Sequence, residues 1–280
     1  MSSASRWQLG TGRAALGTLH GKAPLVAPPL ESLGFEVVLA DLDTNRFGTF
    51  TGEVPRPGSA QQVVELKARA AARAADLPVG LASEGSFGPH PDTPLVTVDL
   101  ELVCLVDVTT DLVVVGRASS LRTAAAAMTA GSVDELEGFC GRVGFGAQAL
   151  VVRPATGASA PIFKGVHERD ELRRAIATVV EATGAPARVE TDLRADRCPT
   201  RRPVIAAAAE DLAARLTSRC PDCGRPGFGP VDAERGRACG LCGLPTRGVA
   251  RLISGCACGF RRAGPDAGPA DPATCDSCNP

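Results

Sequence analysis

The sequence predicts an α/β protein, a mixed sheet layered with helices, followed by a small zinc-ribbon-like module with two four-cysteine sites. Three observations predict this class. Short apolar segments alternate with amphipathic helical patterns, residues 93–107 alternate with a period of two, and close cysteine pairs crowd the end of the chain. We therefore expect an α/β domain at residues 1–195, a connecting helix at 196–217 and a zinc-binding module at 218–280.

The beginning of the chain has the strand, crossover and strand order of an α/β layer. Residues 13–19 are apolar, Pro28 or Pro29 is well placed to open a short helix, and FEVVLA at residues 35–40 is typical of a strand. A long polar loop rich in Gly, Pro and Thr follows at residues 41–59. Loops of this length without regular structure are often functional.

An amphipathic helix is predicted after this loop. The stretch SAQQVVELKARAAARAADL places Val63 and Leu66 on one face with the alanines that follow them. Residues 78–82 read as the next strand. The stretch LASEGSFGPHP then passes through small residues, and we expect a turn at residues 83–86, at the end of that strand.

A hairpin and two helices are predicted in the middle of the chain. The alternating residues 93–107 are expected to pair with residues 111–116. Residues 121–130 are rich in alanine, which favours a helix. Ser132 and Glu135 have the spacing of a capping box, which opens a second helix towards Arg142.

The remaining segments continue the same alternation of strands and helices. Residues 147–152 and 162–166 are predicted strands. A helix is expected at residues 168–183, ended by Gly184, and another at residues 204–218 leads into the cysteine-rich end.

Composition and charge exclude several classes of protein. The formal net charge is −1, which gives no electrostatic argument for nucleic acid or an acidic membrane. No stretch approaches the ~18 apolar residues of a membrane helix. The start lacks a charged segment followed by an apolar one, so we expect a cytoplasmic protein. Eleven cysteines in a reducing compartment indicate metal ligands before disulfides.

Eight of the cysteines form four close pairs after residue 219. The pairs are Cys220 and Cys223, Cys239 and Cys242, Cys256 and Cys258, and Cys275 and Cys278. Each pair can present two thiolates to one metal ion from a tight turn, and a site closed by four thiolates has no open position for a substrate. The pattern predicts two structural zinc ions.

Spacing does not decide how the four pairs combine. We favour sequential pairing, with the first pair joined to the second and the third to the fourth; the alternative is a cross-braced arrangement. Cys198 stands apart and is expected to be a spare buried thiol. Zinc ribbons often bind nucleic acid, but Phe228 and Phe260 alone are too few for a stacking platform, so nucleic acid is not indicated.

Three segments of the α/β domain are expected to converge on a ligand site. The first contains Gly21 and Lys22 at a strand end, where α/β proteins place ligands. The second is the long loop with Glu53, which leads to the helix that carries Lys67. The third is the small-residue stretch at 83–86. Lysines with backbone N–H groups could hold phosphates, and Glu84 with Glu53 could hold Mg²⁺.

This region resembles the inosine triphosphate pyrophosphatases and the related Maf and xanthosine/inosine triphosphatase proteins. The resemblance lies in VVELKARAAARAADLPVGLASEG and in HGKAPLV, and covers about residues 13–90. It implies a nucleoside triphosphate site, with Lys22 and Lys67 on the phosphates and Glu84 on the metal. Gln61 and Gln62 stand where those enzymes carry acids, so a second carboxylate would come from Glu53 or from the predicted hairpin.

The site residues are therefore Glu84 and Glu53 as catalytic or metal-binding acids and Lys22, Lys67, Gly21 and Ser86 on phosphate. Ordinary alternatives are a capping acid for Glu84 and solvated surface lysines. Asp99 and Glu101, on one face of the predicted hairpin, could reach one ion or could lie on a solvated sheet face.

The chain as a whole looks like a family whose domain has no assigned function. FGTFTGEVPRPGS, LASEGSFGPHP, CPDCGRPGFG and ADPATCDSCNP are similar to the motifs of that family and are spread over most of the length. The resemblance implies a globular domain with a C-terminal zinc module. Two functions fit the residues. One is a Mg²⁺-dependent nucleotide hydrolase or its non-catalytic, nucleotide-binding relative, and the other is a protein whose zinc module docks a partner.

Overall fold

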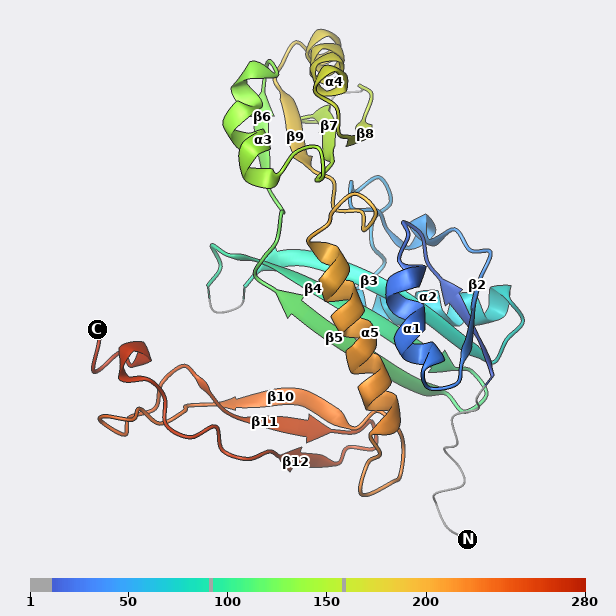
Figure 1. The fold of residues 1–280 in the computed structure, drawn as a ribbon, viewed down its shortest axis with the longest axis vertical. Helices are drawn as coiled ribbons and strands as arrows, with labels where there is room; N and C mark the ends of the chain where they lie inside the picture. The colour runs from blue at the N-terminus through green and yellow to red at the C-terminus, as the bar shows by residue number, and fades with distance from the viewer. Residues whose placement is uncertain (1–11, 91–92, 158–159) are drawn as a thin grey trace. The chain divides into compact units, whose positions relative to one another are not determined.

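The computed structural model describes residues 12–90, 93–157 and 160–280 (Figure 1). The described chain divides into two compact units, one that ends at Asp211 and one that begins at Leu212. We call them the α/β unit and the cysteine-rich unit. Among the described residues no helix combines the length and the apolar character that a bilayer span requires.

A five-stranded mixed sheet forms the first part of the α/β unit, in the order β2-β1-β3-β4-β5. Strand β1 pairs in parallel with β2 and β3, whereas β3, β4 and β5 pair antiparallel. The mixed α/β prediction and the early strand, crossover and strand are confirmed. The elements are β1 (Arg13–Gly17), α1 (Ala23–Glu31), β2 (Glu36–Leu39), a 3-10 turn (Thr44–Phe47), α2 (Ala60–Ala74), β3 (Val79–Pro89), β4 (Thr97–Asp107) and β5 (Leu112–Ser120).

Helix α2 is fixed by its first turn and by a close approach to β3. The Ser59 hydroxyl accepts from the Gln62 backbone N–H, and the Gln62 side chain accepts from the Ser59 N–H, which completes a capping box. Its apolar side chains then pack on β3 and β4. A Cβ at Gly80 would lie 1.9 Å from the Ala68 carbonyl oxygen, so glycine is what lets the helix come this close.

The turn predicted at residues 83–86 is wrong, because β3 continues through it to Pro89. Strand β4 pairs with β3 over its whole length, from Val79 opposite Asp107 to Pro89 opposite Thr97. Local Ser and Gly content favours a turn, but cross-strand hydrogen bonds to a long partner override it. Glu84 therefore lies in the middle of a strand, with its side chain directed by the pleat.

A four-stranded antiparallel sheet forms the second part of the α/β unit, in the order β6-β9-β7-β8. One face is covered by α3 and α4, which share an apolar core with the strands. The elements are β6 (Ala127–Ala130), a 3-10 turn (Asp134–Leu136), α3 (Glu137–Val143), β7 (Leu150–Pro154), β8 (Phe163–Val166), α4 (Arg169–Thr183) and β9 (Ala187–Thr191).

Two helix predictions differ in outcome here. The helix predicted at residues 121–130 is wrong, because residues 127–130 form β6 and pair with β9. Alanine propensity is weak beside the hydrogen bonds of a sheet edge. The helix predicted at residues 168–183 is confirmed as α4, and it ends at Gly184, which has a left-handed backbone (φ 68°).

Helix α5 (Arg201–Thr217) follows, and its first part lies along the five-stranded sheet (Figure 1). Arg201 contacts Glu101 of β4, and the Asp211 carboxylate accepts from the Arg117 N–H of β5. This is the sheet face opposite α2, because Glu101 and the α2-contacting Leu102 alternate on β4.

The cysteine-rich unit contains a three-stranded antiparallel sheet in the order β10-β11-β12. Its elements are β10 (Gly229–Arg235), β11 (Val249–Gly255), β12 (Arg261–Ala263) and a 3-10 turn (Pro272–Thr274). The apolar cluster beside its strands is small and contains Phe228 and Phe260 packed against cysteines.

Candidate functional site: a charged cavity and two cysteine clusters

A cavity of about 860 Å³ opens within the α/β unit. On one side it is lined by the end of β1, the loop at residues 44–56 and the middle of β3. On the other side it is lined by strands β7, β8 and β9, through the sheet face that α3 and α4 leave uncovered. The end of β1, the polar loop and residues 83–86 were all predicted as parts of a site, whereas the second sheet was not.

Seven lysine and arginine side chains line this cavity, against four carboxylates. The cations are Lys22, Arg56, Lys67, Arg153, Lys164, Arg188 and Arg194, and the acids are Glu53, Glu84, Glu190 and Asp192. The chain contains only three lysines among its 30 basic residues, and all three are in this lining. The cavity therefore concentrates positive charge in a protein that is almost neutral overall.

Glu84 is held between two of these cations. Lys67 Nζ lies 2.5 Å from one carboxylate oxygen, and an Arg56 nitrogen lies 2.8 Å from the other. Arg56 also donates to the Gly85 carbonyl oxygen at 2.9 Å. Glu84 and Lys67 are each 7% exposed, so the alternatives of a capping acid and a solvated lysine are wrong. With both carboxylate oxygens paired to cations, Glu84 is poorly available to a metal ion.

Glu190 on β9 makes a second cluster of the same kind. Arg153 Nε donates to one of its oxygens at 2.8 Å and Arg188 Nε to the other at 2.7 Å. Sequence reasoning missed this group. The signal was the alternation in ARVET, where Ala187 and Val189 face the core and the alternate charged residues, Arg188 and Glu190, face the cavity.

Lys22 differs from the other cations because no side chain pairs with it. It is 8% exposed and lines the cavity, so it is not the solvated surface lysine of the alternative. Within the described residues, no carboxylate or other acceptor lies within ion-pair or hydrogen-bond distance of its ammonium. Burial, reinforced by the charge of Arg201, lowers the pKa of Lys22 to about 8.

The remaining predicted site residues, Glu53, Ser86 and Gly21, differ in whether they line the cavity. Glu53 lines the cavity in an ion pair with Lys164, and Thr51 donates to the same carboxylate at 2.6 Å. Ser86 also lines the cavity, beside Arg56. Gly21 is exposed and is not part of the lining; with φ 66° it provides the left-handed turn that leads into Lys22.

Beneath the cavity wall, Arg201 and two acids form a fully buried group. Arg201, Glu101 and Asp99 are each 0% exposed. Arg201 Nε donates to Glu101 at 2.6 Å, and the guanidinium lies over the rings of Phe50 and Phe87, with its carbon 4.7 and 5.5 Å from their centres. The alternative of a solvated sheet face for the two acids is wrong. Nothing local in the sequence pointed to Arg201.

Burial, with the neighbouring Glu101, raises the pKa of Asp99 to about 7. Because the folded protein binds this proton more tightly than the unfolded chain does, the stability that it contributes is lost as pH rises from about 4 to about 7. Asp99→Asn should therefore flatten the fall in stability across this range, as measured by urea unfolding at several pH values.

Asp107 on the same strand is the control for this prediction. Burial acts to raise its pKa, but hydrogen bonds from Thr109 and Thr110 outweigh burial and lower it. Asp107→Asn should therefore remove stability that is present above about pH 4 and lost in acid, the opposite dependence. If the free energy of unfolding depends on pH in the same way for Asp99→Asn and for the parent protein, Asp99 does not hold a proton in the folded protein.

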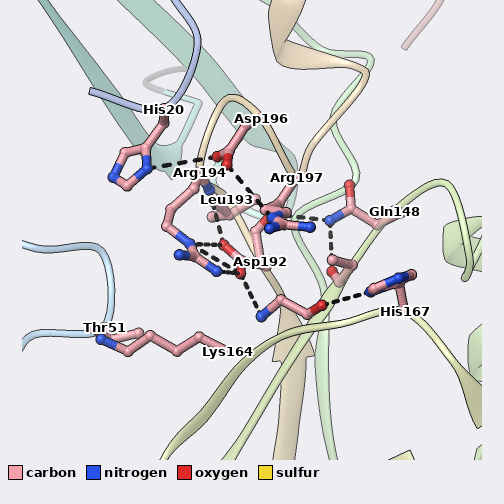
Figure 2. A network of polar contacts seen from close by, with 12 residues as sticks. His20, Thr51, Gln148, Lys164, His167, Asp192, Leu193, Arg194, Asp196 and Arg197 are labelled. Atoms are coloured by element: carbon pink, nitrogen blue, oxygen red, sulfur yellow. Dashed lines mark hydrogen bonds and ion pairs between the residues drawn. The ribbon is translucent and has the colours of Figure 1, made fainter. Parts of the chain in front are cut away.

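A further polar network connects the cavity to the second sheet (Figure 2). The buried Asp192 carboxylate accepts from the Gly165 N–H at 3.0 Å and from the Arg194 side chain at 2.5 Å. Beside it, His20 Nδ1 lies 3.6 Å from an Asp196 oxygen, and burial lowers the pKa of this histidine. These contacts fix the segment after β9 against both halves of the lining.

The four cysteine pairs combine in an interleaved order, so the favoured sequential pairing is wrong. One cluster contains Cys220, Cys223, Cys256 and Cys258, and the other contains Cys239, Cys242, Cys275 and Cys278. The antiparallel sheet explains this order, since β10 and β11 bring the first and third pairs together and leave the second and fourth to meet elsewhere. Cys198 is buried and belongs to neither cluster, as predicted.

The geometry of both clusters suits a tetrahedral metal ion. Sulfur–sulfur distances are 3.6 and 3.8 Å in the first cluster and 3.7 and 3.8 Å in the second. Four sulfurs at the usual zinc–sulfur distance of ~2.3 Å stand ~3.8 Å apart in a tetrahedron. Each cluster could therefore hold one metal ion, with no coordination position left for a substrate.

A protein-family model matches most of the chain. The family described as "Domain of unknown function (DUF6671)" matches residues 67–280. The chain belongs to the DUF6671 family. The matched DUF6671 region begins in α2 and includes both cysteine clusters, which confirms the predicted family of unassigned function with its C-terminal cysteine module.

No curated protein and no solved structure matches this DUF6671 chain. The resemblance to the inosine triphosphate pyrophosphatases and Maf proteins therefore has no support beyond the motifs in which it was seen. Lys22 and Arg56 of the cavity lie before the matched region.

Proposed function

We propose that the cavity of the α/β unit binds a small ligand that carries phosphate, of the nucleotide class, and that the cysteine-rich unit is a structural double-zinc module. The observation that carries the first proposal is the pairing of charges around the cavity. Glu84 and Glu190 are each shared by two cations, and Lys22 has no acid of its own.

These unequal pairings leave positive charge for a ligand at three places. One is beside Glu84 on the first sheet, one is beside Glu190 on the second sheet, and one is Lys22 in the lining. Two positions on opposite walls suit a ligand with anionic groups at separate points. Arginine pairs recognise phosphate in a fixed geometry, and a cavity of this size accommodates a nucleotide.

Binding is better supported than Mg²⁺-dependent hydrolysis. A magnesium site needs carboxylate oxygens that are free to coordinate, whereas Glu84 is paired with Lys67 and Arg56, and Glu53 is paired with Lys164. A hydrolase would have to exchange these ion pairs for the metal when the substrate binds. The nucleotide-hydrolase proposal is therefore second to ligand binding.

Binding is tested by calorimetry and thermal unfolding with pyrophosphate and with a panel of nucleoside triphosphates. We expect a raised melting temperature, because a ligand that binds only the folded state stabilises it. Lys22→Met should weaken binding by roughly 10-fold to 100-fold, the loss of one charged hydrogen bond. Arg69→Met is the control for the loss of a cation, since Arg69 lies on α2 outside the cavity lining, whereas Lys22 lines the cavity.

No rise in melting temperature with any compound of the panel would refute ligand binding. Hydrolysis is tested in the same samples by pyrophosphate release with and without Mg²⁺. If the protein releases pyrophosphate and Glu84→Gln does not, hydrolysis would be better supported than binding alone.

A further inference from the structure

We propose that Lys22 forms an imine with the carbonyl carbon of an aldehyde or ketone ligand that also carries a phosphate group. This inference rests on the proposed function and specifies it, because the phosphate would bind at the paired cations and bring the carbonyl group to Lys22. The reaction adds an activity to the cavity that needs no metal ion.

The three lysines of the lining are in different states. Lys67 Nζ is 2.5 Å from Glu84, and Lys164 is paired with Glu53. An ion pair stabilises the ammonium form, which has no lone pair and cannot attack carbon. Lys22 has no such partner among the described residues, although it is 8% exposed and lines the same cavity. Lys22 is therefore the lysine of the lining whose amine is not held by an acid.

The surroundings of Lys22 favour the neutral amine. Burial and the charges of Arg201 and Lys67 lower its pKa, and they outweigh Glu101 and Glu84, which act to raise it. Burial and like charges are the two means by which enzymes activate a lysine nucleophile. With a pKa of about 8, Lys22 is uncharged in roughly a tenth of the molecules at pH 7. A lysine with an unperturbed pKa is uncharged in well under a thousandth of them.

A second unpartnered group lies in the same wall. Ser83 is 4% exposed and lines the cavity, and its hydroxyl oxygen has no hydrogen-bond partner in the described structure. An unsatisfied buried hydroxyl is costly, so it indicates a group that a ligand satisfies. Ser83 can donate to the carbonyl oxygen of the ligand and so polarise the carbon that Lys22 attacks.

The step is balanced without an oxidant or reductant. The lone pair of Lys22 Nζ forms a bond to the carbonyl carbon, and the oxygen takes up a proton to give a carbinolamine. The carbon–oxygen bond then breaks, the oxygen leaves as water with the two hydrogens that nitrogen gives up, and a carbon–nitrogen double bond remains.

Reductive trapping tests the inference. The full chain is incubated with pyridoxal 5′-phosphate as the probe, reduced with borohydride, digested, and analysed by mass spectrometry. We expect a stable adduct at Lys22, at least ten times more than at Lys67 or Lys164. The yield should rise with pH around a midpoint near 8, and inorganic pyrophosphate should suppress it.

Arginine variants are the matched controls, because arginine keeps the positive charge but cannot form an imine. Lys22→Arg should abolish the adduct, whereas Lys164→Arg should leave it. Pyridoxal without its phosphate should react at least ten times more slowly. Equal labelling of the three lysines, or equal rates for pyridoxal with and without phosphate, would overturn the inference.

The outcome also separates this inference from the proposed function. If pyrophosphate raises the melting temperature but Lys22 is not labelled, the cavity binds phosphate and the imine does not form. If pyrophosphate has no effect on either stability or labelling, both proposals fail.

Discussion

Removing the metal from both cysteine clusters is expected to unfold the cysteine-rich end of the chain, residues 220–280. The apolar core of this unit contains two phenylalanines beside its cysteines, and most of β10 is exposed. We therefore expect metal binding to be the main source of stability, since a structural zinc ion contributes ~10 kcal/mol or more. Limited proteolysis before and after chelation measures the effect, and we expect cleavage to become rapid throughout this unit while the α/β unit stays resistant.

The metal content of two variants tests the interleaved pairing directly. In the first, the cysteines of one observed cluster become serine, and one zinc per chain should remain. In the second, the same number of cysteines is replaced, but they are the first two pairs in the sequence, and no intact site should remain. The two sets are Cys220, Cys223, Cys256 and Cys258, and Cys220, Cys223, Cys239 and Cys242.

Sequential pairing predicts the reverse result, because the second set would then be one complete site. Elemental analysis of the purified full-length variants distinguishes the two. Proteolysis that is unchanged after chelation, or fewer than two metal ions per unmodified chain, would contradict the structural role of the clusters.

The sequence predicted those parts of the fold that depend on neighbouring residues. The first strand, crossover and strand, helix α2 and the β4–β5 hairpin arise from local periodicity and local caps. It also indicated that Lys22 and Lys67 belong to one site, since Lys22 follows a strand end and Lys67 lies on the helix after the polar loop. The eight cysteines were assigned from spacing alone.

The features that the sequence did not reveal depend on contacts between distant residues. Strand β3 extends past Glu84 because β4 supplies its partner, and the turn propensity of SEGS gives no sign of it. The pairing of cysteines is set by which strands become neighbours. The clearest case is Arg201, which lies 100 residues from Glu101 and has no periodic or motif context.

Replacing that buried arginine is the second change with a large expected effect. Arg201→Met should lower the free energy of unfolding of the α/β unit by roughly 3–5 kcal/mol. The reason is that Glu101 would remain buried without its ion-pair partner. It would also lie beside a second buried acid, Asp99. The fall is measured by urea unfolding at neutral pH.

The double variant shows that the loss comes from the orphaned charge. Arg201→Met with Glu101→Gln removes both members of the pair, so it should recover a large part of the stability, because a neutral side chain is less costly to bury than an unpaired carboxylate. Arg69→Met is the control for charge alone. Its partners Asp111 and Glu65 have side chains that are 78% and 36% exposed, and such surface pairs contribute ~0–1 kcal/mol each. The Arg201 guanidinium also contacts Phe50 and Phe87 of the cavity wall. A loss below 1 kcal/mol in Arg201→Met, or no recovery in the double variant, would therefore show that the buried pair does not support this wall.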